Sequence, residues 1–367
     1  MRILFSGGGT TGHVTPAIAI AEYAKKKYGA VEIGFVGRMG GKENDAVKAS
    51  GYKLYEIEIS GLTRKISLEN AKVFRKLVRA YRESKKIIKE FLPDIVIGTG
   101  GYVCLPVLKA AQKMKIPTFI HESNAYPGLV TRLVSGRCKR VFLNVKEAKE
   151  HLRKKSNVIV VGNPVDERFY KTDKRRARAK LGIKKDEFFI CSVGGSGGAE
   201  KINSVMLEVM EEFSKNNKTI KHIHGTGYKY FEDIKKSHPE LCEGKNGVYI
   251  LPYLSDLYLY MNAADVVISR SGAMTLSELA ASATASILIP SPNVTNNHQY
   301  ENAKRLHEKK AAILIEEKDL TKDKVISELT ALINGRDLKE TLSSNINCEF
   351  SGLAEEKILS EIFNSAL

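Results

Sequence analysis

The chain has 367 residues, which is more than one hydrophobic core of ordinary size usually serves, so two domains are expected. A hydrophobic share of 43% and a charged share of 27% are typical of a folded globular protein and exclude collagen-like and low-complexity chains. No apolar run approaches the roughly 20 residues that cross a bilayer, and the first residues lack a signal-peptide pattern. The five cysteines lie far apart, without the close pairs of zinc or redox motifs, and are predicted to be small buried residues in a reducing cytoplasm.

The net charge of +16 is concentrated in the first half of the chain. Residues 1–163 hold 30 Lys and Arg against 13 Asp and Glu, whereas residues 164–367 hold 28 against 29. This asymmetry favours a polyanionic or membrane-surface partner for the first half, with an ordinary soluble basic surface as the alternative. A nucleic-acid partner is not predicted, because the first half has no basic run interleaved with aromatic residues and no known binding motif.

The order of apolar runs and helical patterns predicts an α/β protein of two doubly wound, Rossmann-like parallel sheets. A strand, a glycine-rich turn and a helix are expected at residues 2–24 and again at 188–213. Further strands are expected at 30–36, 94–98, 118–120, 141–144 and 158–162, and then at 221–224, 248–251, 266–269, 286–289 and 312–315. The predicted domains are 1–163 and 164–349, separated at Gly162-Asn163-Pro164, with a C-terminal helix of about 350–367 packing back onto the first. The carboxyl edges of both sheets are expected to line a ligand-binding cleft.

The first glycine loop, Gly7 to His13, follows a strand and is expected to lead into a helix that Pro16 can start. Such a loop brings backbone N–H groups and a helix N-terminus to an anion. Its spacing also fits the dinucleotide fingerprint, but the next strand ends in Gly37-Arg38 instead of the acidic residue that a dehydrogenase needs. His13 is placed to take a proton from a bound hydroxyl, and a capping or packing histidine is the alternative.

Residues 68–91 have the pattern of a basic amphipathic helix. Its apolar positions are Leu68, Phe74, Leu77, Val78, Tyr81, Ile88 and Phe91, and its basic positions are Lys72, Arg75, Lys76, Arg79, Arg82, Lys85, Lys86 and Lys89. At about 1 kcal/mol for each basic residue near an anionic leaflet, this helix could hold the protein at a membrane surface. The alternative is a domain helix whose apolar stripe lies in the core, and the two can coexist if one end is exposed.

The second glycine loop, residues 194–199, repeats the strand, loop and helix arrangement and is expected to bind a second phosphate group. The block from Arg270 to Glu278 follows the strand at 266–269 and is expected to point toward the same ligand. Glu278 could accept hydrogen bonds from both hydroxyls of a ribose. The alternative is that Ser or Thr followed by Glu is only a helix cap.

The chain resembles the MurG-type N-acetylglucosaminyltransferases of bacterial peptidoglycan synthesis over essentially its full length. The resemblance rests on ordered segments: the first glycine loop with His13, Gly100-Gly101-Tyr102-Val103, Ile120-His121-Glu122-Ser123-Asn124 with Pro127-Gly128, Gly162-Asn163-Pro164-Val165, Gly194-Gly195-Ser196, the Arg270 to Glu278 block, and Asn297-His298-Gln299-Tyr300 with Asn302. It implies two domains of the GT-B type that face each other across a cleft. It also implies an inverting transfer of N-acetylglucosamine from UDP-N-acetylglucosamine to the 4-hydroxyl of undecaprenyl-pyrophosphoryl-N-acetylmuramoyl-pentapeptide, at the cytoplasmic face of the membrane.

The resemblance also implies roles for individual residues. The donor side would comprise Ser196 at the phosphates, backbone near Leu254 at the uracil, Met274 and Thr275 around the diphosphate, Glu278 at the ribose, and His298 with Gln299 at the sugar. The acceptor side would comprise Thr10, Thr11, Gly12, Tyr102 and Asn124. His13 is the first choice for the general base and Glu122 the second.

No metal ligand set and no required cofactor are predicted. The chain has no Asp-x-Asp pair of the kind that grips a metal-bound diphosphate, so helix N-termini and backbone N–H groups are expected to stabilise the leaving group, and Mg²⁺ is expected at most to stimulate. The alternatives that the sequence leaves open are a related transferase acting on a glycolipid such as diacylglycerol, a sugar-nucleotide epimerase, and a non-enzymatic scaffold that binds a membrane or polyanion.

Several positions depart from the family pattern. Thr11 stands where glycine is usual, and Ser123 and Gly197 stand where glutamine is usual. Asp166 occupies a position at which some members have arginine, so Arg168 is a possible substitute. Residues 283–285 lack the expected Gly-x-Pro turn, which puts the local backbone in doubt more than the reaction.

Overall fold

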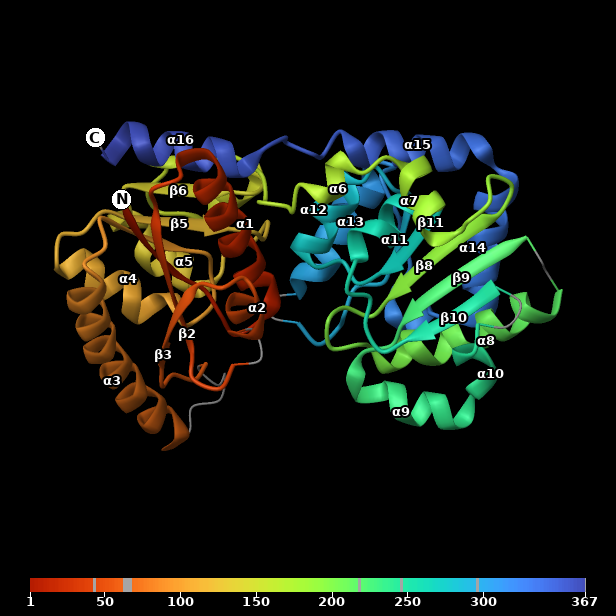
Figure 1. The fold of residues 1–367 in the computed structure, drawn as a ribbon, viewed down its shortest axis with the longest axis horizontal. Helices are drawn as coiled ribbons and strands as arrows, with labels where there is room; N and C mark the ends of the chain where they lie inside the picture. The colour runs from red at the N-terminus through yellow and green to blue at the C-terminus, as the bar shows by residue number, and fades with distance from the viewer. Residues whose placement is uncertain (42–43, 62–67, 217–218, 245–246, 295–296, 367) are drawn as a thin grey trace. The chain divides into compact units, whose positions relative to one another are not determined.

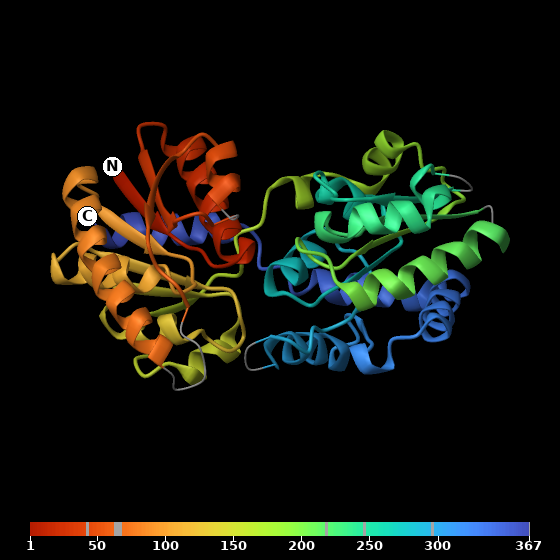
Figure 2. The ribbon, with the colours of Figure 1, turned by 90° about the horizontal axis from the view of Figure 1, so that it is seen from below.

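The computed structural model describes residues 1–41, 44–61, 68–216, 219–244, 247–294 and 297–366. The chain divides into two compact units, Met1–Val165 with Ser351–Leu367 (unit 1) and Asp166–Phe350 (unit 2). Each unit is built on one parallel sheet with helices on both of its faces (Figures 1 and 2). The predicted fold class, two doubly wound parallel-sheet domains, is therefore confirmed.

The sheet of unit 1 has seven strands in the order β3-β2-β1-β4-β5-β6-β7. The strands are β1 (Arg2–Ser6), β2 (Glu32–Arg38), β3 (Lys53–Ile57), β4 (Ile95–Gly98), β5 (Thr118–Glu122), β6 (Arg140–Leu143) and β7 (Val158–Val160). The chain begins in the middle of the sheet, adds β2 and β3 on one side, and then crosses to add β4 to β7 on the other. All neighbouring strands are parallel, so their carboxyl ends share one edge.

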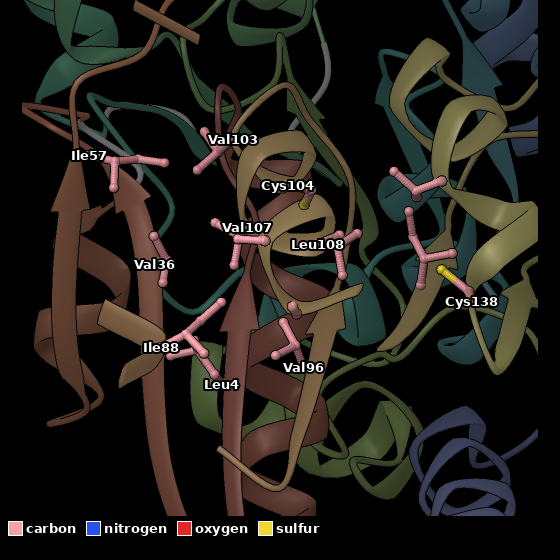
Figure 3. Close-up of a cluster of buried hydrophobic side chains, with 14 of the residues drawn as sticks. Leu4, Val36, Ile57, Ile88, Val96, Val103, Cys104, Val107, Leu108 and Cys138 are labelled. Atoms are coloured by element: carbon pink, nitrogen blue, oxygen red, sulfur yellow. The ribbon is translucent and has the colours of Figure 1, made fainter. Parts of the chain in front are cut away.

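Alternate residues of the unit 1 strands pack against different helices. The helices are α1 (Thr11–Tyr28), α2 (Asn44–Ala49), α3 (Leu68–Phe91), α4 (Cys104–Lys113), α5 (Leu129–Val134) and α16 (Ala354–Ala366), with 3₁₀ turns η1 (Ser135–Arg137) and η2 (Lys146–His151). Ile3 and Phe5 point to the core under α1 and α16, whereas Leu4 points to the core under α3 and α4. Figure 3 shows part of the second core, in which Leu4 lies near Ile88 of α3.

The C-terminal helix α16 belongs to unit 1 although it follows unit 2 in the sequence. It lies alongside α1 (Figure 1), where the rings of Tyr28 and Phe363 are 4.2 Å apart and Lys27 pairs with Glu356 at 2.5 Å. The buried Glu355 carboxylate accepts a hydrogen bond from the Val165 N–H at 2.9 Å. The C-terminal segment of unit 1 is thus fastened to Val165, the last residue of its N-terminal segment.

The sheet of unit 2 has six parallel strands in the order β10-β9-β8-β11-β12-β13. The strands are β8 (Phe188–Val193), β9 (Ile220–Gly225), β10 (Val248–Leu251), β11 (Val266–Ser269), β12 (Ser286–Leu288) and β13 (Ile313–Leu314). The helices are α6 (Arg168–Lys171), α7 (Lys174–Leu181), α8 (Glu200–Asn216), α9 (Tyr228–Ser237), α10 (Pro239–Cys242), α11 (Leu257–Ala263), α12 (Ala273–Ala281), α13 (His298–Glu308), α14 (Lys322–Asn334) and α15 (Arg336–Asn347), with the 3₁₀ turn η5 (Glu317–Asp319).

Three sequence predictions need correction. Strand β3 was not predicted, because it lies at the sheet edge and has the mixed sequence Lys-Leu-Tyr-Glu-Ile. Helix α1 begins at Thr11, so Pro16 lies inside it instead of starting it. Cys348 is exposed and Cys242 is partly exposed, so only three of the five cysteines are buried. At residues 283–285, which lack the Gly-x-Pro turn of the family pattern, Ala283 has a left-handed φ of 50°.

Asp265, just before β11, holds several elements of unit 2 together. Its carboxylate receives Lys174 at 2.9 Å, Lys339 at 3.0 Å, Arg178 at 3.0 Å and the Phe189 N–H at 2.9 Å. Burial alone would raise the pKa of Asp265, but Lys174 and the other donors lower it to about 2. The carboxylate therefore stays ionised and links α7, β8 and α15.

Replacing Asp265 by Asn is expected to destabilise unit 2 by about 3 kcal/mol, because partly buried cations would lose their counter-charge. Urea unfolding followed by circular dichroism measures the change. Glu340→Gln is the matched control: its pair with Arg336 is exposed and lies within one helix, so its loss should cost less than about 0.5 kcal/mol. Equal losses in both variants would contradict a special role for Asp265.

Candidate active site

The first glycine loop lies at the topological switch point of unit 1. Strand β1 pairs with β4, with Ser6 opposite Gly98, and the chain leaves these two strands in opposite directions along the sheet. Such a point creates the ligand-binding crevice of an open α/β sheet. The loops after β1 and β4, residues 7–10 and 99–103, meet there, and the Thr99 N–H donates to the Ser6 carbonyl oxygen at 2.9 Å.

Close packing of these two loops requires glycine. A methyl group on Gly100 would lie 2.6 Å from His13 Nδ1, and one on Gly9 would lie 2.9 Å from the Tyr102 ring. A methyl group on Gly101 would lie 1.8 Å from the Gly8 carbonyl oxygen. Gly9, Gly100 and Gly101 also have φ values of 92°, 107° and 80°. The His13 and Tyr102 rings are therefore fixed against glycine backbone of the neighbouring loop.

Gly101→Ala is expected to damage this site and to cost at least about 2 kcal/mol, because both the backbone conformation and the contact with Gly8 become strained. The thermal midpoint of unfolding and the turnover should both fall. Gly40→Ala is the matched control, since Gly40 also has a positive φ, of 65°, but nothing lies within 4 Å of an added methyl group. If the two variants behaved alike, backbone conformation alone would explain the effect.

His13 lies in the first turn of α1 and is partly buried. The backbone N–H of His13 donates to the Thr10 carbonyl oxygen at 3.2 Å, and the backbone carbonyl oxygen of His13 accepts from the Thr99 hydroxyl at 2.6 Å. Thr10 is exposed at the helix N-cap, Gly12 is partly buried beside His13, and the Thr11 side chain lies outside the described part of the chain. The structure therefore brings His13, Thr10, Gly12 and Tyr102 together.

Glu122, at the end of β5, is buried and occupied by four hydrogen bonds. Oε1 accepts from the backbone and side-chain nitrogens of Asn124 at 3.0 and 3.1 Å. Oε2 accepts from the Gly128 N–H at 2.9 Å and the Thr131 hydroxyl at 2.6 Å. The carboxylate thus orders the 123–128 loop and places Asn124 at the carboxyl edge of the sheet. Ser123, one of the departures, is buried next to it.

The basic helix α3 uses its apolar stripe in the core over its second half. Ala80, Ile87, Ile88 and Phe91 are buried under the sheet, and Leu77 and Tyr81 pack against them. The core alternative is therefore confirmed for this part of the helix, while Leu68, Lys72 and Phe74 lie outside the described side chains. Lys76 and Arg79 pair with Glu58, whereas Arg82, Lys86 and Lys89 are exposed along one face.

Unit 2 has its own switch point between β8 and β11, which are neighbours in the sheet. The second glycine loop follows β8 and the Arg270–Gly272 segment follows β11. A cavity of about 620 Å³ opens there. Its lining includes Gly194, Gly198, Lys201, Arg270, Ser291 and Gln299. The structure thus brings the glycine loop and Gln299 together, with the Ser196 side chain exposed on the loop.

The first turn of α13, which contains His298 and Gln299, is fastened to the switch-point loop. The Ser271 hydroxyl donates to the Gln299 carbonyl oxygen at 2.8 Å, and the Asn302 amide donates to the Ser271 carbonyl oxygen at 3.2 Å. The Gln299 side-chain oxygen accepts from the Ser291 N–H at 2.9 Å. His298 is partly buried beside it.

Glu278 lies on α12, together with Met274, which is buried, and Thr275, which is partly buried. Burial, with a smaller contribution from the Asp166 carboxylate, raises the pKa of Glu278 to about 7. The Arg168 guanidinium is already engaged by Asp166, because it donates to both carboxylate oxygens of Asp166 at 2.7 to 3.1 Å. The departure at position 166 thus adds a negative charge near the ribose candidate.

The sequence analysis missed an aromatic pair beside Leu254. The ring centroids of Tyr228 and Tyr253 are 5.9 Å apart, and the rings are nearly parallel. Tyr228 is 71% exposed and Tyr253 is 45% exposed. The Leu254 side chain is buried under Gly225. Two tyrosines at the ends of successive strands are the signal that could have revealed the pair. Among the described residues, no group of three His, Cys, Asp or Glu side chains could hold a metal ion.

Comparison with known proteins identifies the family. The glycosyltransferase family 28 N-terminal domain matches residues 3–143, and the family 28 C-terminal domain matches residues 189–357. A UDP-N-acetylglucosamine--N-acetylmuramyl-(pentapeptide) pyrophosphoryl-undecaprenol N-acetylglucosamine transferase of Caldicellulosiruptor saccharolyticus is 40% identical over 94% of this chain and 92% of its own length. A relative of the same name from Acetivibrio thermocellus is 41% identical over 94% and 93%. The chain belongs to glycosyltransferase family 28.

Solved structures show the same fold for this family 28 enzyme. The crystal structure of Acinetobacter baumannii MurG has a TM-score of 0.75 with 24% identity, covering 99% of each chain. A putative UDP-N-acetylglucosamine 2-epimerase of Listeria monocytogenes has a TM-score of 0.73 with 15% identity, covering 98% of this chain and 95% of its own. The epimerase likeness concerns the fold alone. The predicted MurG-type resemblance and the predicted transferase activity are confirmed.

Proposed function

We propose that this enzyme transfers N-acetylglucosamine from UDP-N-acetylglucosamine to the 4-hydroxyl of undecaprenyl-pyrophosphoryl-N-acetylmuramoyl-pentapeptide, with inversion at the sugar carbon. The observation that supports it most is the 40% identity, over 94% of the chain, to a relative named for this reaction. The two switch points add physical support. Each sheet presents a glycine loop and a helix N-terminus, which suit one pyrophosphate on the acceptor and one diphosphate on the donor.

On the acceptor side we assign the base to His13. Its imidazole is held by the Gly100-Gly101 backbone at the switch point of unit 1, next to Tyr102 and Thr10. A neutral imidazole there would take the proton of the attacking hydroxyl. Glu122 is then a positioning residue, because the four hydrogen bonds to its oxygens already use it to order the loop with Asn124. Thr11 and Gly12 complete the first helical turn.

On the donor side we assign the diphosphate to the Gly194–Gly198 loop with Ser196, Met274 and Thr275, and the sugar to His298 and Gln299. The cavity beside the glycine loop and Gln299 supports this assignment. The uracil would bind backbone near Leu254, where the exposed Tyr228 and Tyr253 rings offer a flat surface. Glu278 would accept the ribose hydroxyls. Backbone N–H groups, without a required metal, would stabilise the leaving diphosphate.

A direct assay tests the proposed reaction. Purified enzyme is mixed with labelled UDP-N-acetylglucosamine and a short-chain analogue of the lipid-linked acceptor, and label in the lipid product is measured. Acceptor-dependent transfer is expected, and the anomeric configuration of the product reports inversion. Diacylglycerol in place of the acceptor should give no product. UDP release without acceptor, or transfer to diacylglycerol alone, would contradict the proposal and favour an epimerase or a glycolipid transferase.

We propose that unit 1 binds an anionic membrane surface on the cytoplasmic side. On one face of the sheet, α4 packs between α3 and α5, and exposed basic residues of α3 accompany two apolar side chains of α5. These are Leu129 and Leu133, each 51% exposed and one helical turn apart. None of the described helices is long and apolar enough to cross a membrane. Peripheral binding through basic and apolar side chains is the arrangement that fits these residues.

Changing Arg82, Lys86 and Lys89 to Glu is expected to weaken binding to vesicles that contain anionic lipid by at least roughly tenfold, since each basic residue near the leaflet contributes about 1 kcal/mol. Vesicle co-sedimentation measures the effect. The matched control changes Arg175, Lys180 and Lys185, exposed on unit 2, and so alters the net charge equally. Equal weakening in both variants would indicate net charge alone, and no change in the first would exclude this face.

A further inference from the structure

A buried line of polar side chains runs beneath the second glycine loop. It consists of Ser192 on β8, His222 and His224 on β9, and Asn203 in the first turns of α8, and none is more than 3% exposed. Ser192 Oγ lies 2.7 Å from His222 Nε2 and 2.8 Å from His224 Nδ1. His224 Nε2 lies 3.0 Å from Asn203 Oδ1, and Asn203 Nδ2 donates to the Thr226 carbonyl oxygen at 3.0 Å.

The donor and acceptor of each hydrogen bond follow from the group at the end of the chain, the Thr226 carbonyl oxygen. The Thr226 carbonyl oxygen can only accept, so the Asn203 amide presents its nitrogen there and its oxygen to His224. His224 therefore has its proton on Nε2, and Nδ1 accepts from the Ser192 hydroxyl. Ser192 in turn accepts from His222 Nε2–H.

The other tautomer of His224 is disfavoured. With the proton on Nδ1 it would donate to the Ser192 carbonyl oxygen at 3.1 Å, but Nε2 would then face the Asn203 oxygen at 3.0 Å with no donor directed at it. With the proton on Nε2, Nδ1 also lies near the Ser192 carbonyl oxygen, but the Ser192 hydroxyl donates to it at 2.8 Å. Burial lowers the pKa of His222 to about 3 and that of His224 to about 4, so both rings are neutral at pH 7. The chain of donors thus has one direction, from β9 and β8 to α8 and the Thr226 carbonyl.

That carbonyl is the backbone against which the glycine loop packs. A methyl group on Gly198 would lie 2.1 Å from the Thr226 oxygen, and one on Gly227 would lie 2.7 Å from the Gly198 nitrogen and 2.8 Å from the Gly197 oxygen. Any shift of Thr226 therefore displaces the loop directly. Asn203 joins this contact to the first turns of α8, the helix that begins just after the loop.

We propose that Asn203 and His224 are positioning residues that hold the second glycine loop in the shape that binds the donor diphosphate. This inference rests on the proposed function, which assigns the loop to the donor. Apolar side chains could fill the same volume, so stability alone does not call for a directed polar chain in this place. The two ends of the chain of hydrogen bonds explain the choice of residues, because it ties the sheet to a carbonyl that the loop touches.

The test compares the KM for UDP-N-acetylglucosamine with kcat and with the acceptor KM. Asn203→Leu should raise the donor KM and the Kd for UDP by about tenfold, the effect of losing one or two buried hydrogen bonds. The kcat at saturating donor and the acceptor KM should change by less than about threefold. Thr284→Val is the control, because it also removes a buried hydrogen bond, at 2.9 Å, but at the amino edge of the same sheet.

A second pair of variants guards against misfolding of Asn203→Leu. His224→Gln keeps an N–H for Asn203 and should retain a donor KM within about threefold of the native value, whereas His224→Leu should raise it like Asn203→Leu. Unchanged UDP binding in folded Asn203→Leu and His224→Leu would overturn the proposal, as would an equal rise in Thr284→Val. Failure of the proposed function would look different, because the native enzyme itself would then fail to bind UDP or to transfer label.

Discussion

His13→Ala is expected to lower kcat by about two to four orders of magnitude, the usual contribution of a positioned acid or base. The imidazole lies between the first turn of α1 and the Gly100-Gly101 backbone, so its removal deletes the basic nitrogen without deleting a core contact of the sheet. Because the proposed donor site lies in unit 2, the Kd for UDP should remain near the native value. Turnover under saturating donor and acceptor, with UDP binding by calorimetry, measures both quantities.

His13→Gln and Glu122→Gln are the informative comparisons. Glutamine at position 13 keeps a polar side chain but no base, so it should be as slow as alanine. Glu122→Gln places an N–H₂ group where two of the four donors now point, and the 123–128 loop should loosen. Its main effect is expected on the acceptor KM. If Glu122→Gln lost as much kcat as His13→Ala, with an unchanged acceptor KM, the base would be Glu122.

The sequence predicted the strands well where both faces of a strand are buried. β4, β5 and β11 are short apolar runs whose ends agree within two residues with the prediction. Strand β3 escaped because an edge strand with Lys53 and Glu56 lacks that run. The start of α1 was misplaced because proline is common in the first turn of helices, whereas Pro16 here lies in the second turn.

Individual motifs located the candidate site, but their hydrogen bonds could not be predicted. The glycine spacing placed the two loops at strand ends, and parallel topology then brought them to the switch points. Sequence spacing could not show that Glu122 has four donors, because Thr131 and Gly128 reach it only after the chain turns into α5. Nor could it show that Arg168 is engaged by Asp166, or that Ser192, Asn203 and His224 share one chain of hydrogen bonds across three elements.

Acid is expected to unfold unit 2 through its two buried histidines. In the unfolded chain each binds a proton below about pH 6.5, whereas the folded protein keeps them neutral down to about 4 for His224 and about 3 for His222. Stability is therefore present in full above pH 6.5 and is lost as the pH falls. At pH 5 each histidine costs about 2 kcal/mol, and the pair about 4 kcal/mol, a large part of the stability of an ordinary domain.

Glu278 acts in the opposite direction, so the overall pH profile does not isolate the histidines. Its pKa is raised to about 7 in the folded protein, and the proton it gains between pH 7 and 4.5 stabilises the fold by up to about 2 kcal/mol at pH 5. A difference between variants removes this contribution. His222→Gln is suited to it, because the glutamine amide can replace the Nε2–H donor to Ser192 but cannot titrate.

The stability of His222→Gln relative to the native enzyme is expected to improve by about 2 kcal/mol between pH 8 and pH 5. Because the chain has no tryptophan, hydrogen exchange of the β8 and β9 amides is a suitable probe of unit 2. Thr284→Val, which removes no titrating group, should show a difference from the native enzyme that does not change with pH. A constant difference for His222→Gln as well would mean that folding leaves the affinity of His222 for a proton unaltered, and the buried chain would then not be the source of acid sensitivity.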